Sequence, residues 1–149
     1  MPIKLIVSDL DGTLVDANLT ISLRLRQAID RARRAGVTVT IATGRGYPTT
    51  RRFAAQLGID APLICYQGAE IVLPDGTLLY RRAMPREHLR TAIALCESAG
   101  WEISVYHDDQ IYVATMQRDQ AFYDRWFSLP VHQVADLMAA LPSDPIKFI

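Results

Sequence analysis

The sequence contains few cysteines and no long apolar run. Its 149 residues include two cysteines, Cys65 and Cys96, and both lie within apolar segments. This placement suits buried thiols in a reducing cytoplasm better than a disulfide framework. No apolar run approaches the roughly 18 residues that a membrane-spanning helix requires, and the first residues have no signal-peptide pattern. We therefore expect a cytoplasmic protein without a membrane partner.

An excess of charge of either sign is also missing. The chain carries 16 basic and 16 acidic side chains, and its formal net charge is zero. Because nucleic acids are bound through clustered positive charge, this balance predicts no nucleic-acid partner. The composition, 50% hydrophobic and 21% charged, is that of ordinary globular proteins and excludes disordered and collagen-like classes.

Short apolar segments alternate with amphipathic ones in the first half of the chain. Strands are predicted at residues 3–7, 37–42 and 63–66, with helices between Ser22 and Gly36 and over residues 47–57. The continuous apolar run at residues 3–7 is typical of a strand covered on both faces. The order strand, helix, strand, helix, strand predicts right-handed parallel crossovers and a doubly wound α/β sheet.

The pattern changes after residue 69. Pro74-Asp75-Gly76 predicts a hairpin between residues 70–73 and 77–80. An α+β pattern then follows: a helix from Pro85 to Gly100, strands at 102–106 and 110–114 around a turn at Asp108-Asp109, helices near 119–127 and 134–141, and a strand at 146–149. We place the boundary between two domains, 1–83 and 84–149, at this change.

An acidic loop follows the first predicted strand. Asp9 lies at the carboxyl end of that strand, where open α/β sheets bind ligands, and Asp11 lies just beyond it. Two close carboxylates repel unless a cation such as Mg²⁺ or a shared proton lies between them. Gly12 allows a sharp turn that directs backbone amides at an anion. Asp9 could then attack phosphorus and Asp11 could act as acid and base, whereas a simple Asp-Gly turn explains the spacing equally well.

A second polar sequence, Thr43-Gly44-Arg45, follows the second predicted strand. If the two strands are parallel, it lies at the same edge of the sheet as Asp9. The Thr43 hydroxyl and the Gly44 amide suit a phosphate, but taken alone they favour a helix cap and an easy turn. Arg45 could reach a phosphate, although an arginine near a loop is usually solvated.

These residues resemble a known family. Asp9-Leu10-Asp11-Gly12-Thr13-Leu14 and Ala42-Thr43-Gly44-Arg45, followed by Cys65-Tyr66-Gln67-Gly68-Ala69 and a hairpin, are similar to the haloacid dehalogenase (HAD) superfamily of phosphohydrolases, in its Cof-type branch with a C2-type cap. The resemblance implies a Rossmann-like core with an α+β cap, both incomplete in this chain.

The resemblance also implies residue roles and a substrate class. Asp9 would be the nucleophile and Asp11 the acid/base. Leu10, Gly12, Thr43 and Gly44 would bind the phosphate, and Asp9 and Asp11 would hold Mg²⁺. The implied substrates are small phosphorylated metabolites, such as sugar phosphates or phosphorylated cofactors.

The later motifs of that family are not present in this sequence. Its lysine motif and its second acidic loop do not occur, and Lys147 lies on a predicted cap strand instead. The chain is therefore interpreted as the front half of a Cof-type hydrolase. A half-sheet would expose apolar surface, which leaves a homodimer open, and a catalytically incomplete fragment that acts as an association or binding module is the alternative function. A phosphorylated receiver-like module is a third, weaker alternative.

Other candidate residues favour structural roles. His88, His107 and His132 have no metal-ligand spacing and are expected at the surface or satisfied in the core. The aromatic residues near 122–127 are expected to pack a core or an interface, because no basic groove accompanies them.

Overall fold

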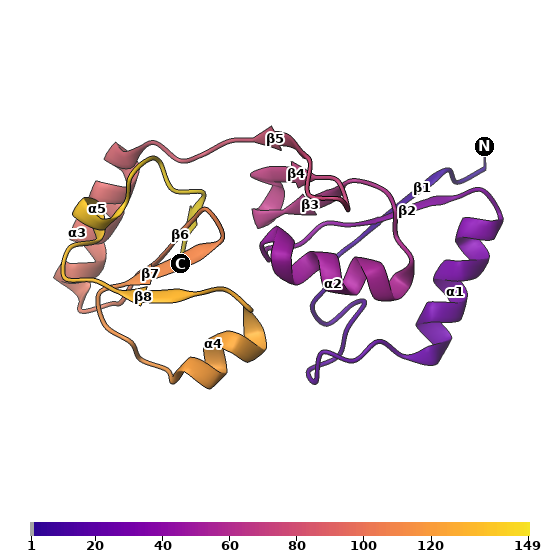
Figure 1. The fold of residues 1–149 in the computed structure, drawn as a ribbon, viewed down its shortest axis with the longest axis horizontal. Coiled ribbons are helices and arrows are strands. Elements are labelled where there is room, and N and C mark those ends of the chain that lie inside the picture. The colour runs from indigo at the N-terminus through magenta and orange to yellow at the C-terminus, as the bar shows by residue number, and fades with distance from the viewer. Residues whose placement is uncertain (1) are drawn as a thin grey trace. The chain divides into compact units, whose positions relative to one another are not determined.

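The computed structural model describes residues 2–149. The chain forms two compact units, Met1–Arg81 and Arg82–Ile149. Figure 1 shows the first unit in indigo to magenta and the second from pink through orange to yellow. Among the described residues, no helix is long and apolar enough to span a bilayer.

Parallel pairing organises the first unit. Strand β1 (Leu5–Ser8) pairs in parallel with β2 (Thr38–Ile41), and helix α1 (Leu23–Arg34) connects them. Helix α2 (Tyr47–Leu57) connects β2 to β3 (Leu63–Cys65), which adds to β2 through a parallel bridge between Ala42 and Ile64. This is the α/β arrangement that the sequence predicted.

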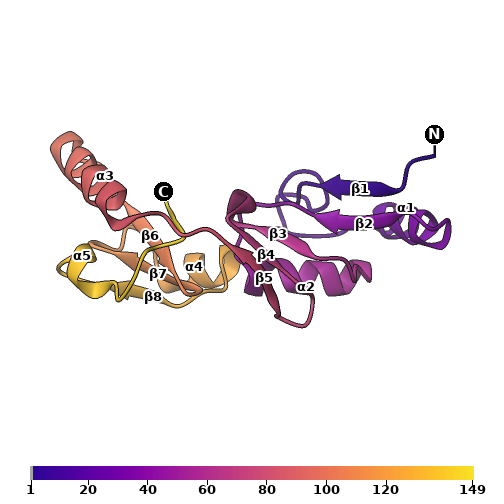
Figure 2. The ribbon, with the colours of Figure 1, turned by 90° about the horizontal axis from the view of Figure 1, so that it is seen from above.

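An antiparallel sheet extends the first unit. Strand β3 pairs with β4 (Glu70–Val72), and β4 pairs with β5 (Leu78–Arg81); Figure 2 shows these elements from above. A short 3₁₀ turn, η1 (Tyr66–Gly68), joins β3 to β4. The hairpin predicted around Pro74-Asp75-Gly76 is confirmed.

Local signals fix the helix ends. The Ser22 hydroxyl accepts a hydrogen bond from the Leu25 N–H (3.2 Å) and so caps α1. Helix α2 has Pro48 in its first turn and ends at Gly58, whose φ of 66° is left-handed. The bounds predicted for α2 are those observed, because each end is set by residues adjacent in sequence.

The expectation that the first strand is covered on both faces is wrong for this chain. Leu5, Ile6 and Val7 are 55%, 40% and 49% exposed. Strand β1 has a partner on one side alone among the described residues, which leaves it at the edge of a two-stranded sheet. An apolar groove of about 260 Å³ also remains open between β1 and α1, lined in part by Ile6, Leu25 and Ile29.

The second unit is a four-stranded sheet with three helices. Its strand order is β8-β7-β6-β9, with β7–β8 parallel and the other pairs antiparallel. The elements are α3 (Arg86–Ala99), β6 (Ser104–His107), β7 (Gln110–Val113), α4 (Gln120–Trp126), β8 (Val131–Gln133), α5 (Leu137–Ala140) and β9 (Lys147–Phe148).

Alternation along β6 places its side chains on opposite faces of this sheet. Val105 packs with Leu89 of α3 and Leu137 of α5 in one apolar core. The neighbouring Tyr106 contacts Phe127, at the end of α4, with ring centroids 6.2 Å apart. Apolar contacts therefore form on both faces of the sheet.

Two element predictions in the second unit need correction. Strand β8 was not predicted, and the helix expected at 134–141 is shortened to α5. Three residues carry too little periodicity to predict a strand, and β8 exists through its pairing with β7. The turn at Asp108-Asp109 is confirmed: both residues have positive φ, 44° and 56°, as a two-residue hairpin turn requires.

Candidate active site

Strand register brings the two polar sequences to one edge of the sheet. Ser8 at the end of β1 is the register partner of Ile41 at the end of β2. The Ser8 carbonyl accepts a hydrogen bond from the Ala42 N–H (2.8 Å), so the pairing continues one residue further. Asp9 and Thr43 therefore both leave the sheet at the carboxyl end of a parallel pair, where α/β proteins bind ligands.

The acidic loop is a tight turn around one buried side chain. Leu10 is fully buried, and its carbonyl accepts the N–H groups of Leu14 (2.9 Å) and Val15 (3.0 Å). Gly12 has a φ of 73°, which permits the reversal that this turn needs. Because Leu10 anchors the loop, the exposed residues on either side of it, Asp9 and Asp11, are held near the sheet edge.

Thr43 does not cap the following helix, contrary to the interpretation favoured by its sequence alone. The N-cap of α2 is Gly46, three residues later. The Thr43 side chain is buried, and its hydroxyl accepts the Arg45 N–H (3.2 Å), which closes a small turn before the helix. The Thr43 carbonyl accepts the Gln67 N–H (3.0 Å), which ties this loop to the end of β3.

Arg45 forms an ion pair that sequence reasoning missed. Its Nε donates to Oδ2 of Asp11 (2.8 Å), and its Nη2 donates to Oδ1 (2.7 Å). The Arg45 side chain is 10% exposed and the Asp11 side chain 47%. The interpretation of Arg45 as a solvated loop residue is therefore wrong, and its place directly after Thr43-Gly44, at the same sheet edge as Asp11, was the signal for this contact.

The two carboxylates of the loop lie in different environments. Both oxygens of Asp11 accept hydrogen bonds from one guanidinium. Within residues 2–149, by contrast, the exposed Asp9 carboxylate has no hydrogen-bond or ion-pair partner. Asp9 is therefore the carboxylate whose oxygens are accessible to a ligand.

The end of β3 packs against the same loop. Tyr66 is buried, and both Tyr66 (φ 49°) and Gln67 (φ 53°) adopt left-handed backbone conformations. A Cβ added to Gly44 would lie 2.8 Å from the side-chain nitrogen Nε2 of Gln67, so the Gln67 side chain would have to shift to admit a larger residue there. The ends of three consecutive parallel strands thus form one packed surface.

The oxygen donors at this edge fit part of a site for a hard cation. Carboxylate and backbone carbonyl oxygens are the ligands that Mg²⁺ prefers. The Asp11 carboxylate is held by Arg45, which leaves the Asp9 carboxylate as the accessible carboxylate donor of the loop. The part of the chain that the structure describes contains no cluster of three acidic, histidine or cysteine side chains that could hold a metal.

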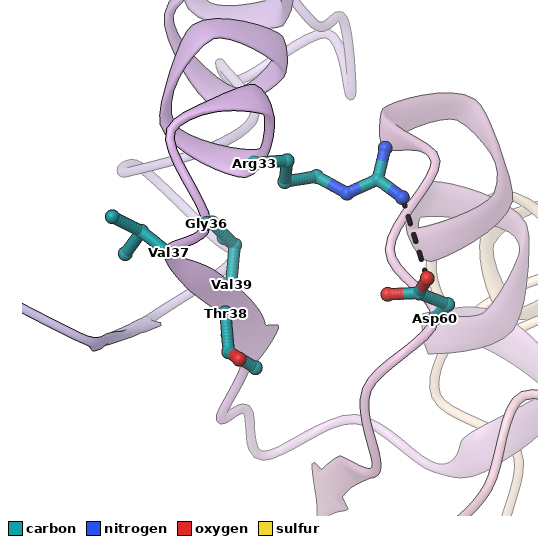
Figure 3. Close-up of a pocket in the computed structure, with 6 residues that line it drawn as sticks. All are labelled: Arg33, Gly36, Val37, Thr38, Val39 and Asp60. Atoms are coloured by element: carbon teal, nitrogen blue, oxygen red, sulfur yellow. Dashed lines mark ion pairs between the residues drawn. The ribbon is translucent and has the colours of Figure 1, made fainter.

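A polar cavity of about 260 Å³ opens at the other end of β2 (Figure 3). It is lined by Gly36, Val37 and Thr38 at the start of the strand and by Arg33, which pairs with Asp60 (3.5 Å). Asp9 and Thr43 follow the opposite, carboxyl ends of β1 and β2. This cavity therefore lies apart from the acidic loop.

His107 and the aromatic segment of α4 make contacts within the second unit. His107 is buried, and its Nε2 lies 2.7 Å from the Ser143 hydroxyl, which is the satisfied histidine that the sequence predicted. Phe122 and Tyr123 contact one another edge to face (5.7 Å) in the aromatic cluster of α4. Neither observation adds a residue to the acidic loop.

The family of the chain is shown by comparison with known proteins. A family model described as haloacid dehalogenase-like hydrolase matches residues 6–148. The chain belongs to the haloacid dehalogenase-like hydrolases. The resemblance to the Cof-type branch of this superfamily, inferred from Asp9-Leu10-Asp11-Gly12 and Thr43-Gly44-Arg45, is confirmed at this level.

Two curated relatives of the chain are phosphatases by name. Phosphatase YwpJ of Bacillus subtilis is 30% identical over 116 residues, which cover 78% of this chain and 41% of the relative. The 5-amino-6-(5-phospho-D-ribitylamino)uracil phosphatase YcsE of the same organism is 32% identical over 78% of this chain and 43% of the relative. The chain thus spans less than half of the length of these two relatives.

Solved structures of the family share the fold. A haloacid dehalogenase-like hydrolase from Bacteroides thetaiotaomicron superposes with a TM-score of 0.79 at 22% identity, over 99% of this chain and 57% of that chain. TM0651 from Thermotoga maritima gives a TM-score of 0.76 at 25% identity, over 99% of this chain and 55% of that chain. The expected fold class, a partial Rossmann-like HAD core with further α+β structure, is confirmed.

Proposed function

We propose that this haloacid dehalogenase-like chain contributes the nucleophile and the acid/base residue of a phosphatase that hydrolyses phosphate monoesters. The observation that carries the proposal is the contrast at the sheet edge: an accessible Asp9 carboxylate beside an oriented Asp11 carboxylate. Within the proposal, residues 1–83 are the front half of the catalytic core and residues 84–149 are part of its cap.

Asp9 is the nucleophile in this proposal. One of its carboxylate oxygens attacks the phosphorus atom, the bond between phosphorus and the ester oxygen breaks, and an aspartyl-phosphate forms. A nucleophile needs an oxygen that no other group occupies, and the Asp9 carboxylate meets that condition within residues 2–149.

Asp11 moves the protons. In the first step it gives a proton to the departing ester oxygen, which leaves as an alcohol. In the second step it takes a proton from the water that attacks the aspartyl-phosphate, so that phosphate is released and the Asp9 carboxylate is restored. One side chain can serve in both steps because the ester oxygen and the water occupy the same side of the phosphoryl group in turn.

Backbone and hydroxyl groups hold the phosphoryl oxygens. Leu10 lies between the two carboxylates and Gly12 follows Asp11, while Thr43 and Gly44 lie at the neighbouring strand end. The Gly12 N–H donates to the Val15 carbonyl (2.9 Å), so in this proposal that bond opens when the phosphate binds. Oriented N–H groups stabilise the charge that develops during phosphoryl transfer, and this is commonly the largest single contribution to catalysis.

Mg²⁺ is the cofactor that we propose, held by the Asp9 carboxylate and the Asp11 backbone carbonyl. The chemistry supplied by bound Mg²⁺ is neutralisation of the charge on the phosphate and on the attacking carboxylate. The residues described here supply two of the oxygen donors, and an octahedral site needs further ones.

The substrate that we propose is a small phosphorylated metabolite, either a sugar phosphate or a phosphorylated cofactor. The name of the relative YcsE, a phosphatase of a ribitylamino-uracil phosphate, supports this class. The balanced charge of the chain supports a small ligand over a nucleic acid. Phosphorylated metabolites of this kind are found in the cytoplasm, where we place the protein.

The test is phosphate release by the full-length protein and by its Asp9→Asn variant. We expect the wild-type protein to release phosphate from p-nitrophenyl phosphate in the presence of Mg²⁺ and Asp9→Asn to release none, because an amide oxygen is a poor nucleophile. Asp16→Asn is the matched control, since Asp16 lies in the same loop and its carboxylate accepts local N–H groups of Asn18 and Thr20. Unchanged release by Asp9→Asn would rule out the mechanism.

The alternative function, an association module without turnover, is favoured by the exposed apolar strand β1. Its distinguishing result is a stable homodimer of the 149-residue chain together with no phosphate release by the wild-type protein.

A further inference from the structure

The ion pair between Arg45 and Asp11 is held in place from several sides. The Arg45 guanidinium lies over the ring of Phe53, 5.9 Å from its centroid, and Phe53 is 2% exposed. The Arg45 carbonyl accepts the Tyr66 N–H (3.0 Å), and the Arg45 N–H donates to Thr43 (3.2 Å). Because backbone and side chain are both fixed, the guanidinium has a defined position beside the acidic loop.

In a forked contact, two N–H groups of one guanidinium donate to the two oxygens of one carboxylate, and this fixes the orientation of the carboxylate. The two N–H groups of Arg45 reach the two oxygens of Asp11 at 2.8 and 2.7 Å, which fixes the plane of the carboxylate as well as its position. A carboxylate offers about four lone-pair sites, and this contact uses two of them. Each Asp11 oxygen therefore retains a site that can accept a proton while Arg45 holds the group.

We propose that Arg45 is a positioning residue for the acid/base Asp11: its forked contact holds the Asp11 carboxylate in the orientation from which proton transfer to the ester oxygen and from water occurs. This inference rests on the proposed function. Proton transfer requires hydrogen-bond distance to the reacting oxygen, and a displacement of about 1 Å can cost about 100-fold in rate. An Asp11 side chain at 47% exposure would otherwise be free to adopt other rotamers.

The experiment is a double-mutant cycle in the full-length protein with p-nitrophenyl phosphate as substrate. We expect Arg45→Met to lower kcat by about 10- to 100-fold with little change in KM, because orientation and not binding is lost. In an Asp11→Asn background, where no acid/base group remains to be positioned, Arg45→Met should cause no further loss.

Two further variants separate the forked geometry from charge and from packing. Arg45→Lys keeps the positive charge but cannot form the fork, and we expect its kcat to stay well below wild type. Arg52→Met is the matched control, because Arg52 also lies over Phe53 (5.2 Å) but is exposed and, among the described residues, has no ion pair with the acidic loop. We expect Arg52→Met to retain wild-type kcat.

Three results would overturn the positioning role: an equal loss of kcat from Arg45→Met in the wild-type and Asp11→Asn backgrounds, full activity of Arg45→Lys, or a raised KM with unchanged kcat. If Arg45→Met does not fold, the same cycle with Arg45→Lys decides the question. Failure of the proposed function itself gives a different result, because Asp9→Asn would then release phosphate at the wild-type rate. That result would also rule out the positioning role of Arg45.

Discussion

The Tyr66 ring fills the space that a side chain at residue 46 would need. A Cβ placed on Gly46 would lie 2.7 Å from Cζ of Tyr66, closer than real Cβ contacts come. Tyr66 is 3% exposed and directly follows β3, whereas Gly46 is the N-cap of α2. This contact links the third strand end to the loop that carries Thr43 and Arg45, so the packing of one ring helps to define the candidate site.

Gly46→Ala should therefore destabilise the first unit. Overpacking of this kind typically costs about 1–3 kcal/mol. We expect faster amide hydrogen exchange in residues 38–70 of the variant, measured by mass spectrometry.

The control for this prediction is the same substitution in a Tyr66→Ala background. With the ring removed, Gly46→Ala should cost markedly less than in the wild-type chain, because the clash is the cause. An equal cost in both backgrounds would show that the contact between the two residues is not the cause.

The exposed face of β1 should drive self-association of the 149-residue chain. Leu5 and Val7 alternate onto one face of an edge strand and are 55% and 49% exposed. A charge on that face opposes strand pairing between copies, so Leu5→Lys should lower the average mass measured by sedimentation equilibrium.

The matched variant is Leu95→Lys, since Leu95 is an equally apolar and exposed (62%) side chain, but on α3. It should leave the average mass unchanged. Equal effects of the two variants would indicate a general solubility effect and not an edge-strand contact.

Tyr106 should make the second unit lose stability at high pH. Burial raises the pKa of Tyr106 from 10.0 to about 12. Between these values the unfolded state loses the phenolic proton while the folded state keeps it, so the free energy of unfolding falls by about 1.4 kcal/mol per pH unit. Burial lowers the pKa of Lys147, whose ammonium lies 5.3 Å from the centroid of the Tyr106 ring. Just below the ordinary lysine pKa of 10.5, this shift makes the free energy of unfolding rise with pH, which opposes the effect of Tyr106.

The measurement is denaturant unfolding between pH 9 and 12 followed by tryptophan fluorescence, because Trp101 and Trp126 both lie in the second unit. Tyr106→Phe should flatten the decline above pH 10.5, whereas Tyr80→Phe, at an exposed tyrosine, should not. A wild-type slope that persists in Tyr106→Phe would assign the decline to other groups.

Ser143 should stabilise the second unit through His107. The imidazole is 2% exposed, and Ser143→Ala would leave its Nε2 without the hydroxyl partner at 2.7 Å. An unsatisfied buried polar group costs about 1–3 kcal/mol, which tryptophan fluorescence in urea can measure.

Ser98→Ala is the control, because the Ser98 hydroxyl bonds within its own exposed helix turn. Its effect should stay within about 0.5 kcal/mol. If Ser143→Ala were no more destabilising than this control, water would be able to satisfy the histidine.

Features set by neighbouring residues were predicted from the sequence. Helix α2 has the predicted bounds because Pro48 and Gly58 act on the backbone locally. The turn at Asp108-Asp109 was predicted for the same reason. The hydrophobic pattern located the carboxyl ends of two strands, and this placed Asp9 and Thr43 at those strand ends.

Contacts between distant residues were decided by the tertiary structure. Asp11 and Arg45 are 34 positions apart, and their forked contact exists because parallel register places two strand ends side by side. Strand β8 is a strand because β7 pairs with it, and β1 is exposed because it has a neighbour on one side within the described residues. The sequence by itself thus determined most of the secondary structure, the family motif and the chemical type of the candidate site. Which carboxylate is held and which is accessible followed from packing alone, because that choice depends on side chains brought together from separate segments.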